Sequence, residues 1–132
     1  TIKIPMAGVL VIQSPAYTKG GEYSGAEIAK LLECSLEEWP YRENYPWISL
    51  IDFDNELNGE KLNDFLWLSF TRSDPAQDLF GFHSEIIHKH WGCEAPIIVD
   101  ARVKPHHQKP LKVSEVVRNR ATQILNSEGI FF

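Results

Sequence analysis

The sequence predicts an α/β domain of three layers, in which a mostly parallel or mixed sheet lies between helices. Short apolar runs of strand length alternate along the chain with segments of helical periodicity. The strand runs are apolar throughout, as expected for strands that are covered on both faces, and no internal repeat is present. The 132 residues are 43% hydrophobic, which is enough for one core, so we expect residues 1–132 to form one domain.

Three apolar runs predict buried strands. They cover residues 6–12 (MAGVLVI), 47–51 (WISLI) and 97–99 (IIV), and the last two end at aspartates. Residues 79–82 predict a further short strand. The segment between Pro75 and Pro96 could add an antiparallel member, and residues 83–93 fit neither pattern clearly.

Three segments predict helices. Ser24 and Glu27 form a capping box at the start of the first helix. The second begins near Asn58, is ended by Pro75, and places one face toward the core: Leu62, Phe65, Leu66, Ser69 and Phe70, with Trp67 also packed. The third starts near Ser114 and ends at Gly129, and its predicted buried stripe comprises Val113, Val116, Val117, Ala121, Ile124 and Leu125.

Charge and composition exclude several classes of protein. Thirteen basic residues against eighteen acidic ones give a net charge of −5, which argues against a nucleic-acid or anionic-lipid partner. No apolar run reaches the roughly 18 residues of a membrane span, and no signal-peptide pattern opens the chain. We expect a cytoplasmic protein in which Cys34 and Cys93 are reduced thiols.

Asp52 and Asp54 follow a buried strand, where ligands of open α/β sheets gather. Two carboxylates there could hold magnesium for phosphoryl transfer, with one attacking phosphorus. The alternative is that both aspartates turn the chain and cap the next helix, which is the commoner use of such residues.

His88, His90 and Cys93 are three potential zinc ligands within six residues, and His83, His106 or His107 could be a fourth. Their spacing matches no common zinc site, so we expect no metal here. Cys93 beside His90 could also be an activated thiolate, but an inert buried thiol is favoured.

Arg72 lies just beyond the second predicted helix, among several aspartates. We expect it to form a bidentate bridge to a carboxylate that fixes the loop. A substrate carboxylate is the alternative partner.

The acidic strand end at residues 51–54 (IDFD) and the segment 64–78 (DFLWLSFTRSDPAQD) resemble the C-terminal domain of the UbiD family, whose helix has the form DxxWxxxTRxxPxxD. Residues 99–101 (VDA) with Lys104 and Pro105 resemble that domain's closing IDAT-type strand and KP turn, and residues 7–9 (AGV) its first strand. Arg102 stands where the family has threonine. The resemblance rests on Asp52, Asp54, Asp64, Trp67, Thr71, Arg72, Pro75, Asp78 and Asp100.

The resemblance implies a non-oxidative decarboxylase of aromatic or α,β-unsaturated acids that uses prenylated FMN with a divalent metal and potassium. In the family, the flavin site and the catalytic residues belong to a preceding domain with an EGPFGEY-like segment, which this sequence lacks. The resemblance therefore assigns this chain no catalytic, cofactor-binding or metal-binding residue. It implies instead a lid and assembly role, with the upstream flavin domain of the same chain and a homo-oligomer as partners.

Phe80, Phe82 and His83 follow the second helix and are the candidates for a pocket wall that faces the flavin domain. The apolar tail at residues 130–132 is expected to pack against another protomer or that domain. Three hypotheses follow. The chain is a lid domain of a UbiD-like decarboxylase, without activity in isolation. Alternatively, it is an independent magnesium-dependent phosphotransferase or phosphatase that uses Asp52 and Asp54, or a free-standing oligomerisation module.

Overall fold

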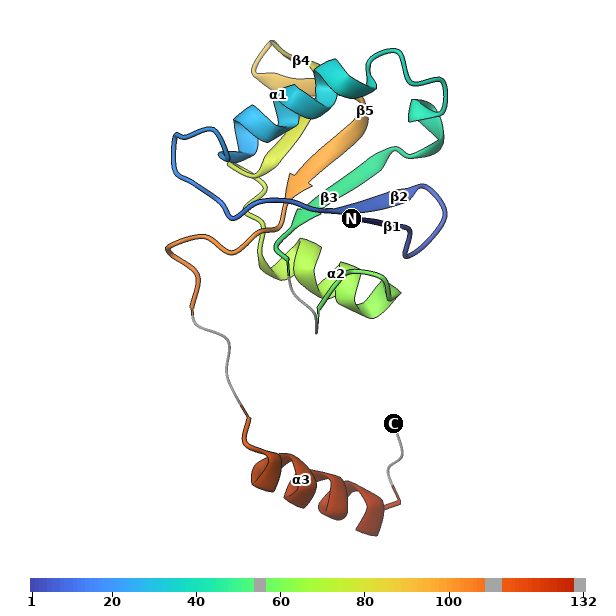
Figure 1. The fold of residues 1–132 in the computed structure, drawn as a ribbon, viewed down its shortest axis with the longest axis vertical. Helices are drawn as coiled ribbons and strands as arrows, with labels where there is room; N and C mark the ends of the chain where they lie inside the picture. Colours follow the sequence, from blue (N-terminus) through green and yellow to red (C-terminus); the bar gives the residue numbers. More distant parts are fainter. Residues whose placement is uncertain (54–56, 109–112, 130–132) are drawn as a thin grey trace.

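The protein folds around one mixed sheet of five strands in the order β1-β2-β3-β5-β4 (Figure 1). The computed structural model describes residues 1–53, 57–108 and 113–129. Strands β2 (Val9–Gln13), β3 (Trp47–Ile51) and β5 (His90–Asp100) run parallel. Strands β1 (Ile2–Lys3) and β4 (Leu79–Ile87) pair antiparallel at the two edges.

Helices α1 (Gly25–Leu36) and α2 (Leu62–Thr71) cover opposite faces of the sheet, which confirms the predicted three layers (Figure 1). The core on the α1 face contains Leu10, Ile28, Ala29, Ile48, Leu50, Phe82 and Ile98. The core on the α2 face contains Val9, Val11, Ile51, Phe65, Leu68 and Ala101. Since the central strands contribute to both cores, their sequences are apolar throughout rather than alternating.

The strands lie close to their predicted positions. The prediction for residues 47–51 is confirmed at both ends, and the first parallel strand begins at Val9, after Gly8 turns the chain with φ of 81°. Strands β4 and β5 are longer than predicted, because they continue past the sheet as a two-stranded ribbon. The antiparallel strand that the sequence left open is therefore β4.

Helix α1 begins as predicted at Ser24, whose hydroxyl accepts the Glu27 amide as an N-cap. The other half of the predicted capping box is not formed, because the Ser24 amide donates to the Gly21 carbonyl. The buried face of α2 differs from the prediction. Phe65, Leu68 and Ser69 point inward, and the Ser69 hydroxyl hydrogen-bonds that of Ser49 on β3 at 2.8 Å.

The residues predicted beside Phe65 and Ser69 on that inner face lie on the outer one. Leu62, Leu66 and Phe70 are 43, 41 and 67% exposed, and Trp67 is 49% exposed. Because α2 is apolar on both sides, periodicity alone could not identify the side that faces the sheet.

Helix α3 (Glu115–Ser127) forms where predicted, with Ser114 as its N-cap and Gly129 at φ of 72° beyond its end. The prediction that it buries an apolar stripe is wrong. None of its residues is buried, and the helix lies apart from the sheet (Figure 1). The stripe residues stay accessible: Val113, Val116, Val117 and Ile124 are 45 to 77% exposed, Ala121 is exposed and Leu125 is intermediate.

The apolar tail at residues 130–132 lies outside the described residues, so its predicted contact stays a prediction. Within residues 1–53, 57–108 and 113–129, no helix combines the length and the apolar character needed to cross a bilayer.

The two faces of α2 can be compared directly by truncating Leu68 and Leu66. Leu68 is fully buried, so Leu68→Ala should lower the free energy of unfolding by about 2–5 kcal/mol through lost contacts and a cavity. Leu66→Ala, the control on the outer face of the same helix, should cost less than about 1 kcal/mol. Urea denaturation of the 132-residue chain measures both, and equal costs would contradict the observed orientation of α2.

Candidate functional site: a charged network at the carboxyl ends of the parallel strands

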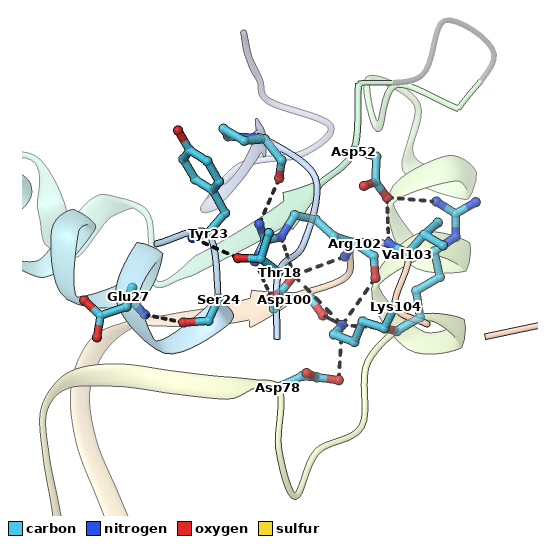
Figure 2. A network of polar contacts seen from close by, with 12 residues as sticks. Thr18, Tyr23, Ser24, Glu27, Asp52, Asp78, Asp100, Arg102, Val103 and Lys104 are labelled. Atoms are coloured by element: carbon cyan, nitrogen blue, oxygen red, sulfur yellow. Dashed lines mark hydrogen bonds and ion pairs between the residues drawn. The ribbon is translucent and has the colours of Figure 1, made fainter. Parts of the chain in front are cut away.

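The carboxyl ends of the three parallel strands gather charged side chains at one edge of the sheet. Asp52 follows β3, Asp100 ends β5, and Arg102 and Lys104 lie in the segment after β5 (Figure 2). This is the edge at which open α/β sheets usually bind ligands. This edge is therefore the candidate functional site. The contacts of each charged side chain determine whether it is free to bind a ligand or serves the structure.

The central contact is a buried bidentate ion pair between Asp100 and Arg102. Arg102 Nε donates to Asp100 Oδ1 at 2.8 Å, and Nη2 donates to Oδ2 at 2.7 Å, with both side chains fully buried. Arg102 Nη1 donates to the Pro15 carbonyl after β2, and the guanidinium lies over the Tyr17 ring. Arg102 thus joins the ends of β2 and β5.

The first turn of α1 lies directly on this pair. A Cβ added to Gly25 would meet Asp100 Oδ2 at 2.7 Å and the Phe80 ring at 2.9 Å. The close approach places a carboxylate at the amino-terminal end of a helix, where the helix dipole favours negative charge. Glycine at position 25 is therefore required by the space that Asp100 occupies.

Lys104 forms a second buried centre beside the first. Its Nζ donates to the carbonyls of Arg72, Asp100 and Arg102 at 2.5 to 3.3 Å, and lies 3.3 Å from Asp78 Oδ2 (Figure 2). The Asp78 carboxylate also accepts the Asp74 amide at 2.7 Å. Lys104 thereby fastens the turn before β4 to the segment after β5.

Asp52 is held by the backbone as well as by an arginine. Its Oδ2 accepts the Val103 amide at 2.6 Å and lies 3.8 Å from Arg72 Nη1. Arg72 is 8% exposed and packs over the Trp67 ring. The predicted contact between Arg72 and a carboxylate is present, but the bidentate bridge is made by Arg102. Asp54, the other predicted magnesium ligand, lies outside the described residues.

A cavity of about 490 Å³ opens above the network. It is lined by the loop after β2, the first turn of α1, the turn at residues 74–78 and the segment after β5, and Tyr17, Phe80, Lys104 and His106 belong to its wall. Of the charged residues that line it, Asp78 and Lys104 pair with each other, and Lys19 and Asp74 also belong to the wall. Beside it, His107 Nδ1 accepts the Lys104 amide, and burial together with His106 and Lys104 lowers the pKa of His107.

The three candidates for a pocket wall occupy different places. Phe80 lines the cavity, Phe82 is fully buried in the core, and His83 lies on the surface in a separate cluster with Glu37 and Glu94. Their role toward another domain stays a prediction.

The other residues that carry the family resemblance serve the helix and its turn. Asp64 is in the first turn of α2, and the Thr71 hydroxyl donates to the Trp67 carbonyl at 2.6 Å. Pro75 lies in the turn that Asp74 and Asp78 hold together through backbone amides.

The histidine and cysteine candidates for chemistry lie on the ribbon. His88 is at the tip, His90 begins β5, and Cys93 Sγ lies against Gly81, where no Cβ would fit. In the described part of the chain, no three histidine, cysteine or acidic side chains are placed to hold a metal ion. Burial raises the pKa of the Cys93 thiol, which disfavours a thiolate nucleophile.

Comparison with known proteins gives matches to segments of longer chains. The chain is 32% identical over 102 residues to a subunit, designated C, of the 4-hydroxybenzoate decarboxylase of Chlamydia pneumoniae, a match that covers 70% of this chain and 17% of the relative. An uncharacterized protein of Chlamydia trachomatis is 32% identical over 98 residues, covering 67% of this chain and 17% of the relative. The chain thus spans less than a fifth of the length of these curated relatives.

No family model matches the chain. Among solved structures, the open form of the vanillic acid decarboxylase of Sedimentibacter hydroxybenzoicus matches 92% of this chain and 26% of its own. The sequence identity is 14% and the TM-score is 0.49.

The two arginines of the network should differ in their contribution to stability. Arg102→Met strands a fully buried Asp100 and should cost about 3–5 kcal/mol, whereas the paired change Asp100→Asn with Arg102→Met should recover part of this loss. Arg72→Met should cost less than Arg102→Met, because Asp52 keeps the Val103 amide. Chemical denaturation measures all three, and a larger loss for Arg72→Met would contradict the central position of Arg102.

Proposed function

We propose that this chain is the C-terminal lid and assembly domain of a UbiD-like non-oxidative decarboxylase that acts on aromatic or α,β-unsaturated carboxylic acids. In this proposal the chain has no activity alone. Its partners are a flavin-binding domain and further copies of the enzyme, in the cytoplasm.

The observation that carries the proposal is the apolar outer ridge of α2, formed by Leu62, Leu66 and Phe70, with Trp67 beside it. The four side chains are 41 to 67% exposed, and Leu62, Leu66 and Phe70 follow the spacing i, i+4, i+8. The Phe70 ring also lies 6.1 Å from the ring of Trp47 at the start of β3, measured between centroids. A helix that is apolar on both sides is normally covered on both. The ridge therefore fits a surface that is covered by another domain or another protomer.

The charged network supports a scaffold role rather than catalysis. Asp52, Asp78 and Asp100 each accept hydrogen bonds from, or pair with, groups of this same chain. Buried pairs of this kind fix one geometry, which suits a rigid lid that excludes water when domains close. The same engagement of Asp52 Oδ2 makes a magnesium-dependent phosphotransferase the less supported alternative.

The comparison with the Chlamydia pneumoniae protein supports the substrate class. That relative is named as one subunit of a 4-hydroxybenzoate decarboxylase, and this chain matches 17% of it. Most of such an enzyme therefore lies outside the segment that this chain matches, and we place the site of the reaction in that remaining part. Because the relative is one of several subunits, a separate partner polypeptide is the alternative to a flavin domain in the same chain.

In this proposal the chain itself binds neither prenylated FMN nor its metal ions. The described residues contain no group of three histidine, cysteine or acidic side chains placed for a metal ion, and Asp78 and Lys104 in the wall of the cavity pair with each other. We propose that the flavin-binding domain holds the cofactor.

The proposal is tested on the full-length product of the parent gene, through its intact mass and its absorbance spectrum. A product much larger than 15.1 kDa with a flavin spectrum that decarboxylates an aromatic acid is the expected result. A flavin-free homo-oligomer of this chain alone would contradict it and support the oligomerisation module. A flavin-free monomer that hydrolyses phosphate esters with magnesium would support the phosphotransferase.

The role of the ridge is tested by Phe70→Glu, with Ser35→Glu on the exposed side of α1 as the matched control. In the isolated 132-residue chain, both should change the free energy of unfolding by about 1 kcal/mol or less. In the full-length product, Phe70→Glu should lower the thermal midpoint or dissociate the assembly, because a charge would be buried without a partner. Light scattering and calorimetry measure this, and a full-length Phe70→Glu protein that behaves as wild type would refute burial of the ridge.

A further inference from the structure

The ribbon formed by β4 and β5 contains an irregularity at His83. The register runs from Leu79 opposite Val99 to Gly81 opposite Ile97, shifts on both sides of Phe82, and resumes with Glu85 opposite Gly92. His83 has φ of 47°, in the left-handed region that residues with a Cβ seldom adopt. The ladder is therefore irregular between Gly81 and Glu85, and a ribbon segment of residues 85–92 lies beyond this irregularity.

The ribbon segment carries exposed apolar side chains. Ile86, Ile87 and Trp91 are 75, 54 and 45% exposed. These three side chains are therefore largely free of contacts with the rest of the described chain.

Three carboxylates from two elements hold His83 in this conformation. The His83 amide donates to Glu33 Oε1 of α1 at 2.6 Å, in place of a ladder bond to β5. The ring contacts Glu94 Oε2 of β5 through Nδ1 at 2.9 Å and Glu37 Oε1, at the end of α1, through Nε2 at 3.3 Å. Both ring nitrogens thus face carboxylate oxygens, and only the protonated ring can donate to both.

The charge around the ring is negative without that proton. Arg42 of the 3₁₀ turn η1 (Arg42–Asn44) lies 3.4 Å from Glu37 and 3.6 Å from Glu94, and packs over the Phe82 ring. One guanidinium therefore pairs with two of the three carboxylates that contact His83. Lys30 and Glu33 line the neighbouring depression on one side, and Glu37, Glu38, Arg42 and Glu43 line the one on the other.

These contacts also favour protonation. The hydrogen bond to Glu94, followed by the charge of Glu37, raises the pKa of His83 above that of an exposed histidine. The bound proton is therefore part of the cluster at mildly acidic pH.

We propose that the protonated His83 clamps the ribbon segment to α1, and that loss of this proton releases the segment about the irregularity at His83. Because the clamp needs the cation, it is closed below the pKa of His83 in the folded chain and opens as the pH rises through that value. This device is independent of the proposed decarboxylase role.

The experiment uses the 132-residue chain with a nitroxide on Cys34, an exposed residue of α1, in a Cys93→Ser background. Paramagnetic relaxation of the amides of residues 85–92 reports their proximity to α1, and the ring carbon signals of His83 report its protonation. Relaxation enhancement should fall with the same pH midpoint as the His83 titration. In the unlabelled chain, the protection of the His83 amide from hydrogen exchange should fall as the pH rises through the His83 titration. The total fall should be tenfold for each unit by which the clamped state raises the pKa of the His83 ring.

Variants separate the clamp from general pH effects. Glu94→Gln should move the midpoint to lower pH, and His83→Asn, which tolerates the left-handed backbone, should leave the segment released at every pH. His90→Gln, on the ribbon but outside the cluster, is the control and should behave as wild type. Relaxation enhancement that stays constant through the His83 titration, or a midpoint that Glu94→Gln does not move, would overturn the proposal.

Discussion

The ion pair between Asp100 and Arg102 is the contact on which the functional edge of the sheet depends. Asp100 ends β5, accepts from Arg102, and lies beneath the first turn of α1 at Gly25, while Arg102 reaches the chain after β2. Taking both charges out of water is costly unless every donor and acceptor is used. The neighbouring contacts of Lys104 and Asp78 obey the same requirement, so this edge has one permitted arrangement.

The charged groups around His83 are more exposed to solvent than those around Asp100. There the carboxylates of Glu37 and Glu94 and the ring of His83 are exposed to water, although Arg42 is partly buried, so salt screens these pairs and each contributes little alone. The molecule thus combines one end that is rigid because its charges are buried with one segment whose position depends on solution conditions. A third kind of surface, the outer side of α2, carries apolar side chains rather than charge.

The sequence predicted the layers, the three parallel strands and the capping of α1, because each depends on local patterns of apolar residues and on short-range hydrogen bonds. It did not predict the inner face of α2 or the isolation of α3, since both depend on what lies opposite a helix. At the site, Arg72 and Asp52 were found from their spacing. Arg102 was noticed only because it replaces the threonine of a family motif, and its pair with Asp100 was not predicted. The signal for that pair was present in the sequence, since Arg102 stands two residues after an aspartate that ends a strand.

The strand order has a consequence for how the chain folds. β5 lies between β3 and β4 in the sheet but follows both in the sequence. Until β5 is in place, β4 has no neighbour in the sheet, and Phe82 of β4 has no completed core to enter. β4 and β5 can pair early as a hairpin, because only His88 and Lys89 separate them, whereas the pairing of β5 with β3 is non-local. Non-local pairing is slow and leaves apolar strand edges open to other chains. The greatest risk of aggregation therefore falls before β5 has paired with β3.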